Sequence, residues 1–272
     1  MLTPRFHCPQ AVPGLARGTR VELPPDAAHH AMRVLRLREG QPVAVFCGHG
    51  GEYEGELEAA RGKSAAVVLG AFHACDRAPR LDVHVQQAVV ATEKMDWVVE
   101  KAVELGAHRF TPVLAERSVV RLNGERAARR AAHWQALAVS ASEQCGLNRL
   151  LEVRPVQALD TACAGPHEAG ALLCMLDPEG EHPLTALVAG AASAAPDAVV
   201  PRSLVLLVGP EGGFSPAEAA LARAAGYVRA TLGPRVLRTE TAALAALAAL
   251  RATLDDFSPS SRPAPALLPE PA

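Results

Sequence analysis

Long apolar runs and aromatic residues are both scarce in this chain of 272 residues. No uninterrupted apolar stretch reaches the roughly 20 residues that a membrane-spanning helix needs, and residues 1–10 lack the apolar core that follows a basic start in a secretory signal. These absences predict a cytoplasmic protein with no membrane partner. Aromatic residues make up only 4% of the chain, but a hydrophobic fraction of 49% with 21% charged residues excludes global disorder.

Cysteine is present but not clustered. The six cysteines form no CxxC pair, and no histidine stands at metal-ligand spacing from them. A disulfide framework belongs to short secreted chains, and a zinc site needs clustered ligands. The sequence therefore predicts no metal and six reduced, mostly buried thiols: Cys8, Cys47, Cys75, Cys145, Cys163 and Cys174.

Four common catalytic signatures are also missing: GxGxxG, GxxxxGK[ST], HExxH and GxSxG. Their absence excludes the ordinary nicotinamide, ATP, zinc-protease and hydrolase interpretations. A net charge of −2 does not indicate a nucleic-acid binder. Residues 117–154, however, hold seven arginines against three acids, and residues 29–38 hold two histidines and three arginines. These basic side chains either are solvated individually on the surface or form two local basic patches on a nearly neutral protein.

The first 75 residues have the pattern of a small β-barrel, with short alternating strands and glycine-rich turns. A short helix with Asp26 as its cap is expected after Pro25. The polar, aperiodic stretch 73–80 predicts a linker. The expected strands are 19–23, 42–46, 52–57 and 65–69.

From Leu81 the pattern changes to alternating strands and helices, which predicts a mostly parallel sheet covered by helices. Thr92 is the expected cap of one helix, and Ser215 with Glu218 forms a capping box at the start of another. The proline-rich stretch 255–272 predicts a disordered tail. Strands are expected at 81–90, 110–114, 150–153, 171–176, 203–208 and 227–232, and helices at 92–105, 124–145, 216–225 and 240–254.

Two loops stand at the carboxyl ends of predicted strands, where open α/β sheets bind ligands. The first, 209–215 (GPEGGFS), has three glycines that let its backbone approach a ligand, before the free N–H groups of a helix start. The second, 233–241 (GPRVLRTET), has two arginines and a glutamate. Burying these charged side chains would be unfavourable if the loop packed inward and only connected two elements. The residues alone predict a small-ligand site built from these two loops.

The two loops carry a resemblance to a known family. LLVGPEGGFSPAE (206–218) and LGPRVLRTETAALAAL (232–247) resemble the paired signature of the RsmE-type methyltransferases of the SPOUT superfamily, and the likeness extends over about residues 4–254. It implies an α/β protein in three parts. These are a PUA-like RNA-binding β-barrel (1–74), a SPOUT domain with a C-terminal trefoil knot (79–254), and the disordered tail (255–272).

The resemblance also implies an activity and partners. Members use S-adenosyl-L-methionine to methylate N3 of a uridine in 16S ribosomal RNA of the small ribosomal subunit. The resemblance also implies an obligate homodimer. The backbone that wraps the cofactor would comprise Val208, Gly209, Pro210, Glu211, Gly212, Gly213, Leu232, Gly233, Val236, Leu237, Arg238, Thr241 and Ala242, with Leu232 and Leu237 flanking the adenine.

Catalysis requires loss of the N3 proton from uracil, through a base or through cationic stabilisation of the uracil anion. Arg238 and Arg235 are candidates for the cationic role, with Arg238 preferred. Glu211, Glu240 or Glu143 could serve as the base. The expected RNA contacts are Arg5, His30, Arg33, Arg36, Lys94, Arg117, Arg121 and Arg149.

The chain departs from the family pattern in one segment. Leu147 follows Glu143-Gln144-Cys145-Gly146 where the family has an arginine, and Leu151 replaces a proline. Arg149 could stand in for that arginine. This departure leaves two alternatives open: a SPOUT enzyme with another acceptor, such as a ribose 2′-hydroxyl, or an inactive RNA-binding assembly factor.

The helix predicted over 240–254 is apolar on nearly every face, whereas a surface helix would show a polar stripe. Its alanines would let another backbone approach closely. We expect one side to be buried by its own domain and another, including Leu247, by a second subunit; the alternative is burial within one subunit.

Overall fold

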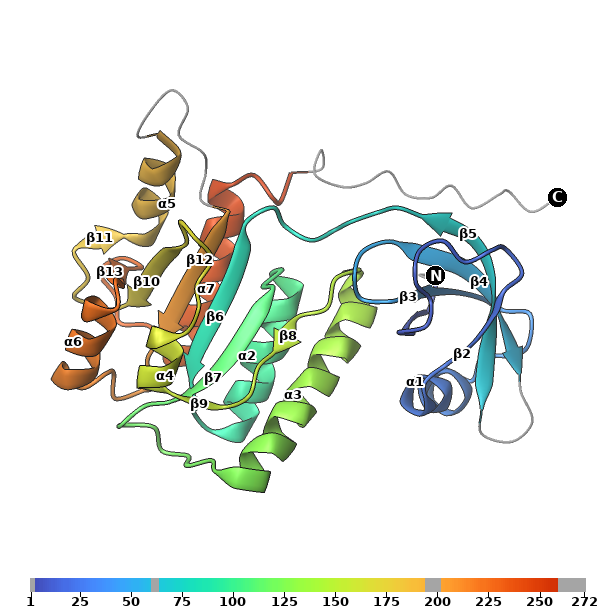
Figure 1. Cartoon of the computed structure of the whole chain (residues 1–272), viewed down its shortest axis with the longest axis horizontal. Helices are drawn as coiled ribbons and strands as arrows, with labels where there is room; N and C mark the ends of the chain where they lie inside the picture. The colour runs from blue at the N-terminus through green and yellow to red at the C-terminus, as the bar shows by residue number, and fades with distance from the viewer. Residues whose placement is uncertain (1–2, 60–63, 194–201, 259–272) are drawn as a thin grey trace. The chain divides into compact units, whose positions relative to one another are not determined.

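The computed structural model describes residues 3–59, 64–193 and 202–258 (Figure 1). The chain divides by its internal contacts into two compact units. The first unit contains the described residues up to Ala78 together with Ser142–Leu150. The second contains Pro79–Ala141 and the described residues from Leu151 to Ser258. A short segment from the middle of the chain therefore belongs with the N-terminal unit.

The first unit is built on a five-stranded sheet in the order β1-β3-β4-β5-β2. Its strand pairs are antiparallel except for β1 with β3, which is parallel. Its core is filled by side chains such as Phe6, Val45, Tyr53, Leu57 and Val67. The predicted small β-barrel is confirmed as this half-barrel sheet. The strands are β1 (Arg5–His7), β2 (Arg20–Glu22), β3 (Pro42–Phe46), β4 (Glu52–Ala59) and β5 (Ala65–His73).

A short helix, α1 (Pro25–His29), continues into a π-helical turn, η1 (His30–Val34). The prediction that Asp26 caps this helix is wrong. Pro24, with extended backbone, occupies the N-cap position, and Asp26 lies inside the first turn. Because the fixed φ of proline suits the first helical position, Pro25 starts the helix earlier than predicted.

The segment Ser142–Leu150 is held in the first unit by a buried polar network. Arg5 donates to the carbonyl oxygen of Ser142 at 2.9 Å and to the Glu52 carboxylate at 3.0 Å. Arg77 donates to the same carboxylate at 2.9 Å and to Asn148 at 2.8 Å. Asn148 in turn donates to Glu52 at 2.8 Å. Two guanidinium groups and an amide thus converge on one carboxylate, whose side chain is only 14% exposed.

This network makes the first unit acid-sensitive. Burial alone would raise the pKa of Glu52, but the hydrogen bond from Arg77 and the charges of Arg5 and Arg77 outweigh it and lower the pKa to about 2. A lowered pKa stabilises the fold above the ordinary value of 4.5, and this stabilisation is lost as the pH falls towards 2. Glu52→Gln should therefore cost about 3 kcal/mol at pH 7 and flatten the acid dependence between those two values.

Hydrogen exchange of the β3, β4 and β5 amides measures this effect in the first unit. Glu58→Gln is the matched control, because Glu58 pairs with the half-exposed Arg20 and its side chain is 39% exposed. The control should change stability by less than about 1 kcal/mol. Equal acid dependence in Glu52→Gln and the wild type would contradict the prediction.

The second unit contains a parallel sheet in the order β11-β13-β10-β12-β6-β7-β8, with β9 also paired to β7. All six residues of β12 are buried, as its continuous apolar run predicts. The predicted α/β class is confirmed. The strands are β6 (Asp82–Ala88), β7 (Arg109–Leu114), β8 (Glu152–Val153), β9 (Gln157–Ala158), β10 (Leu172–Leu176), β11 (His182–Pro183), β12 (Ser203–Val208) and β13 (Val228–Thr231).

Helices cover this sheet, with α7 packed against α2 and α5, and α4 against α6. The capping box of Ser215 and Glu218 is confirmed at the start of α6. Thr92 is not a cap: it is the first residue of α2, Ala91 occupies the N-cap position, and no side chain caps that helix. The helices are α2 (Thr92–Glu104), α3 (Gly124–Cys145), α4 (Leu159–Ala164), α5 (Leu184–Ser193), α6 (Pro216–Ala224) and α7 (Thr239–Thr253).

Beyond α7, residues 255–258 form a turn in which Asp256 accepts a hydrogen bond from Arg251 at 3.3 Å. The rest of the predicted tail, 259–272, lies outside the described residues. None of the six cysteines takes part in a disulfide bond; four of them are buried and two half-buried. In the described ranges no helix has the length and apolar character to cross a membrane. The trefoil knot stays a prediction, because strand order and register do not describe the threading of the chain.

Candidate functional site

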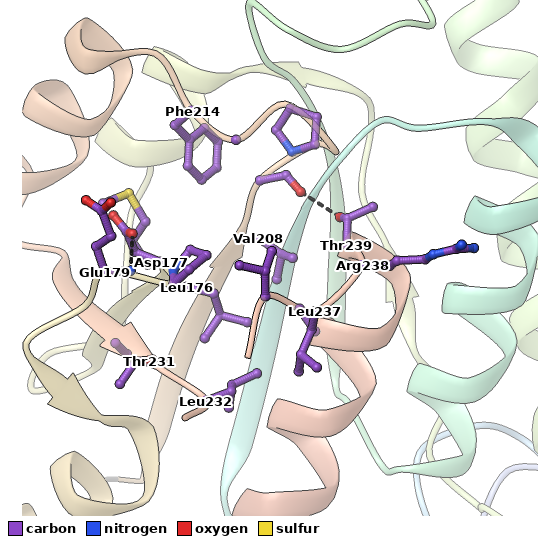
Figure 2. A pocket seen from close by; sticks show the side chains of 18 of the residues that line it. Leu176, Asp177, Glu179, Val208, Phe214, Thr231, Leu232, Leu237, Arg238 and Thr239 are labelled. Carbon is purple, nitrogen blue, oxygen red and sulfur yellow. Dashed lines mark hydrogen bonds between the residues drawn. The ribbon is translucent and has the colours of Figure 1, made fainter. Parts of the chain in front are cut away.

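A cavity of about 720 Å³ lies where β10, β12 and β13 end (Figure 2). These strands are neighbours in the parallel sheet, so their carboxyl ends meet at one edge. The cavity is lined by residues 175–179, 208–211, 213–214, 230–233 and 235–239, with Arg117, Ala219 and Ala242. Both loops singled out in the sequence therefore belong to one site.

The cavity combines apolar side chains with exposed backbone. Figure 2 shows Leu176, Val208, Leu232 and Leu237 grouped around its centre. The ring of Phe214 lies over the backbone of Gly209, so closely that a Cβ added there would meet the ring at 3.2 Å. This arrangement suits a flat apolar ligand group held by main-chain hydrogen bonds.

All the predicted cofactor contacts line the cavity except Gly212 and Thr241. Gly212 is turned towards Arg117, which donates to its carbonyl oxygen at 2.7 Å. Thr241 is exposed on α7. Leu232 and Leu237, predicted to flank an adenine, both line the cavity.

The sequence reasoning missed the wall formed by Asp177, Pro178 and Glu179 after β10. Arg229 holds this wall: it donates to Asp177 at 2.8 Å and to the carbonyl oxygen of Glu179 at 3.0 Å. Burial would raise the pKa of Asp177, but the hydrogen bond from Arg229 outweighs it and lowers the pKa. An Asp-Pro-Glu-Gly turn after a predicted strand was a usable signal, because that strand also ends at this edge. Met175, Ala219, Ala230 and Thr231 were missed as well.

Two of the three glutamates proposed as bases are paired with one lysine. Lys94, from α2, lies 2.9 Å from Glu211 and 3.4 Å from Glu240. Burial would raise the pKa of Glu211, but the hydrogen bond from Lys94 outweighs it and lowers the pKa. The same hydrogen bond raises the pKa of Lys94. Lys94, expected to contact RNA, thus joins α2, the 209–215 loop and the start of α7.

Arg235 and Arg238 contribute unpaired positive charge to this site. Both line the cavity, and neither guanidinium has a hydrogen bond or ion pair within the described part of the chain. Figure 2 shows Arg238 extending away from the group of leucines. By contrast, Asp177 and Glu211 each have a cationic partner. The free charge at the rim is therefore positive, which suits an anionic or electron-rich substrate.

Comparison with known proteins places this site in a family. A family model of an RNA methyltransferase domain matches residues 77–251, and a model of an RNA methyltransferase PUA domain matches residues 23–69. The chain belongs to the RNA methyltransferase family. The resemblance seen in the sequence is thereby confirmed.

Relatives and solved structures of this RNA methyltransferase family cover most of the chain. The ribosomal RNA small subunit methyltransferase E of Mycobacterium tuberculosis is 34% identical, with 83% of each chain covered. The protein of the same name from Bacillus subtilis is 28% identical over 83% of this chain and 87% of its own. The Neisseria gonorrhoeae methyltransferase E bound to S-adenosyl methionine is 30% identical, with a TM-score of 0.77 over 92% of this chain and 98% of that one. A Legionella pneumophila protein with bound SAM is 32% identical, with a TM-score of 0.79 over 93% and 98%.

The expected RNA contacts of this family member have different environments. Arg33 and Arg36 are exposed on the first unit, whereas His30 is half-buried and meets the ring of Phe6 edge-on. Arg5 is half-buried in the Glu52 network. Arg149 donates to Asp76 at 2.6 Å, and Arg121 donates to the carbonyl oxygens of Ala115 and Glu116.

The segment that departs from the family pattern has a structural role. Glu143 accepts a hydrogen bond from the backbone N–H of His7 at 2.8 Å, and burial raises the pKa of Glu143. The carbonyl oxygen of Leu147 accepts from Arg5 at 3.2 Å. Leu147 and Leu151 are both buried. Glu143, considered as a base, belongs to the first unit and does not line the cavity.

Proposed function

We propose that the protein transfers a methyl group from S-adenosyl-L-methionine to N3 of a uridine in 16S ribosomal RNA. The observation that carries this proposal is the cavity at the ends of β10, β12 and β13, lined by the GPEGGF and GPRVLRT loops. Relatives over most of the chain are named ribosomal RNA small subunit methyltransferase E, and one solved structure of that name binds S-adenosyl methionine.

The cavity residues fit this cofactor. A volume of about 720 Å³ falls in the usual range for ligands of this size. Leu176, Leu232 and Leu237 offer apolar surface for the adenine, and the backbone of 209–213 and 232–238 offers hydrogen bonds to its polar edge. Asp177 and Thr231 supply acceptor groups of the kind that bind ribose hydroxyls. When bound, the cofactor supplies an activated methyl group on a sulfonium.

The remaining task of the protein is to prepare the uracil. N3 lies on the Watson–Crick edge and carries a proton, so the base has to be unpaired and the proton lost. The described residues that line the cavity include no histidine, lysine, cysteine or tyrosine. Because Lys94 lowers the pKa of Glu211, that carboxylate is a weak base. We therefore propose that the N3 proton passes to solvent water and assign the main role to Arg238, assisted by Arg235, in stabilising the uracil anion that remains. Glu211 and Glu240 hold Lys94.

RNA recognition is assigned to cations in both units. Arg33 and Arg36 of the first unit are exposed, and Arg117 and Arg121 of the second carry charges that are not neutralised by a described carboxylate. With a net charge of −2, long-range attraction to RNA is weak. We therefore propose that the assembled small subunit, which can be recognised by its shape as well as its charge, is a better substrate than naked RNA. We also propose that the protein acts in the cytoplasm.

We also propose that the protein works as a homodimer. On α7, Leu244 and the alanines at 245, 248 and 249 are only half-buried, which leaves an apolar face for a second subunit. Leu247 is not on that face, because it is fully buried within its own unit. Replacing Leu247 with a charged residue would test the packing of the core. Ala248→Arg is therefore the better probe of the dimer contact. Sedimentation of the wild type as a monomer at micromolar concentration would contradict the dimer.

The deciding experiment is methylation of small subunits from a strain that lacks the endogenous enzyme, followed by mass spectrometry of the nucleosides. We expect 3-methyluridine at one position, and less of it with naked RNA. A 2′-O-methylated nucleoside would assign a different acceptor. Binding to subunits without methyl transfer would identify an assembly factor instead.

A further inference from the structure

Three residues from three segments form a line of hydrogen bonds at the cavity wall. Gln87 is the penultimate residue of β6, Thr239 begins α7, and Gly209 directly follows β12. The side-chain amide of Gln87 donates from Nε2 to Oγ1 of Thr239 at 2.9 Å. Thr239 donates from Oγ1 to the carbonyl oxygen of Gly209 at 2.6 Å, the dashed line in Figure 2. Thr239 and Gly209 line the cavity, and Gln87 stands behind them.

We call the line of hydrogen bonds from Gln87 through Thr239 to Gly209 the relay. Its direction is fixed by the chemistry of its donors and acceptors. A carbonyl oxygen can only accept, so the single hydroxyl proton of Thr239 goes to Gly209. The hydroxyl oxygen then has to accept its other hydrogen bond, so Gln87 presents its amide nitrogen. This orientation has a cost. Gln87 is fully buried, and its Oε1 has no hydrogen-bond partner among the described residues. A buried acceptor without a partner is rare and unfavourable.

The relay joins the two cavity loops at Gly209 and Thr239. Gly209 has no side chain, and Pro210 has no N–H, so the Gly209 carbonyl is the group that can be held. The second link between these loops is Lys94, which pairs with Glu211 at 2.9 Å and with Glu240 at 3.4 Å. The Lys94 and Glu211 side chains are 32% and 39% exposed, and that of Glu240 is 12% exposed. Exposed ion pairs contribute little. The buried relay is therefore the stronger constraint on the distance between the loops.

We propose that Gln87 and Thr239 are positioning residues for the cofactor loop. They orient the Gly209–Pro210 peptide and so set the shape of the 209–213 backbone before the ligand arrives. This inference rests on the proposed function, since it takes the ligand to be S-adenosyl-L-methionine. Gln87 does this without lining the cavity.

The first test compares two substitutions of Thr239 by calorimetry with S-adenosylhomocysteine. Thr239→Val keeps the shape and removes the hydroxyl, and it should raise Kd at least about tenfold because the Gly209 carbonyl loses its donor. Thr239→Ser keeps the hydroxyl and should stay within about threefold of the wild type. Unchanged affinity in Thr239→Val, or equal weakening in both variants, would overturn the proposal.

The second test reverses the direction of the relay. In Gln87→Glu an ionised carboxylate can only accept, so it takes the proton of Thr239 away from Gly209, and binding at pH 8 should weaken about tenfold. Burial raises the pKa of the introduced carboxyl, so lowering the pH towards 5 restores a donor and should restore affinity relative to the wild type. Gln87→Met removes the donor to Thr239 and has no titratable group, so it should weaken binding by the same factor at pH 8 and at pH 5.

The outcomes separate this inference from the proposed function. If the affinity of Gln87→Glu relative to the wild type is the same at pH 8 and at pH 5, or if Gln87→Met binds as tightly as the wild type at both, the relay is wrong. If the wild type binds S-adenosylhomocysteine but Thr239→Val binds it equally well, the relay alone fails. If the wild type releases no heat with S-adenosylhomocysteine, the proposed function fails.

Discussion

Replacing Arg238 with alanine should lower kcat for methylation of small subunits by about a hundredfold to a thousandfold, the usual effect of removing one group that stabilises developing negative charge. Arg238 is exposed at the rim of the cavity and has no hydrogen bond or ion pair within the described ranges. Its loss therefore leaves no buried partner uncompensated, and stability should change by less than about 0.5 kcal/mol. Kd for S-adenosylhomocysteine should stay within about threefold. Rate assays at saturating cofactor and subunit measure the effect.

Two variants control this result. Arg126→Ala removes an exposed arginine from α3, away from the cavity lining, and should leave kcat unchanged. Arg238→Lys keeps the charge without the planar fork and should recover part of the rate. A wild-type kcat in Arg238→Ala would exclude the role assigned to this arginine. A loss explained entirely by weaker cofactor binding would make Arg238 a binding residue.

Replacing Arg251 with methionine should destabilise the second unit by about 3–5 kcal/mol, the range for removing one partner from a buried charged network. Arg251 is 1% exposed and lies near the end of α7. It donates to the carbonyl oxygens of Leu105 at 2.9 Å and Gly106 at 2.7 Å, where α2 ends, and to that of Leu81 at 3.1 Å. Methionine fills similar space but leaves all three carbonyl groups without this donor.

Denaturant unfolding followed by tryptophan fluorescence measures this change, because Trp97 and Trp134 both belong to the second unit. Arg129→Met is the control, since Arg129 is 77% exposed on α3, and it should shift stability by no more than about 0.5 kcal/mol. A cost below about 1 kcal/mol for Arg251→Met would mean that water replaces the guanidinium at these carbonyl groups.

The sequence predicted the cavity loops well because their signals are local. A glycine-rich turn between a buried strand and a capped helix can be recognised as a ligand-binding turn from about fifteen consecutive residues. The family resemblance rests on the same short stretches. The opposite wall at Asp177–Glu179 was missed, since its turn carries no glycine-rich loop and acquires its place only when β10 pairs with both β12 and β13. Helix starts were misplaced at Asp26 and Thr92, where backbone geometry, and not side-chain type, sets the first turn.

By itself the sequence determined the order of a small β-barrel and an α/β unit, the family, and the two loops of the site, since periodicity and contiguous motifs depend on near neighbours along the chain. Tertiary structure alone decided which charges remain free. Lys94 and Arg5 look like RNA contacts in the sequence, but each pairs with carboxylates from remote segments, whereas Arg235 and Arg238 find none in the described ranges. Only the fold brings Gln87, Thr239 and Gly209 into one line, because hydrogen bonds between residues 152 and 30 positions apart leave no pattern in the sequence.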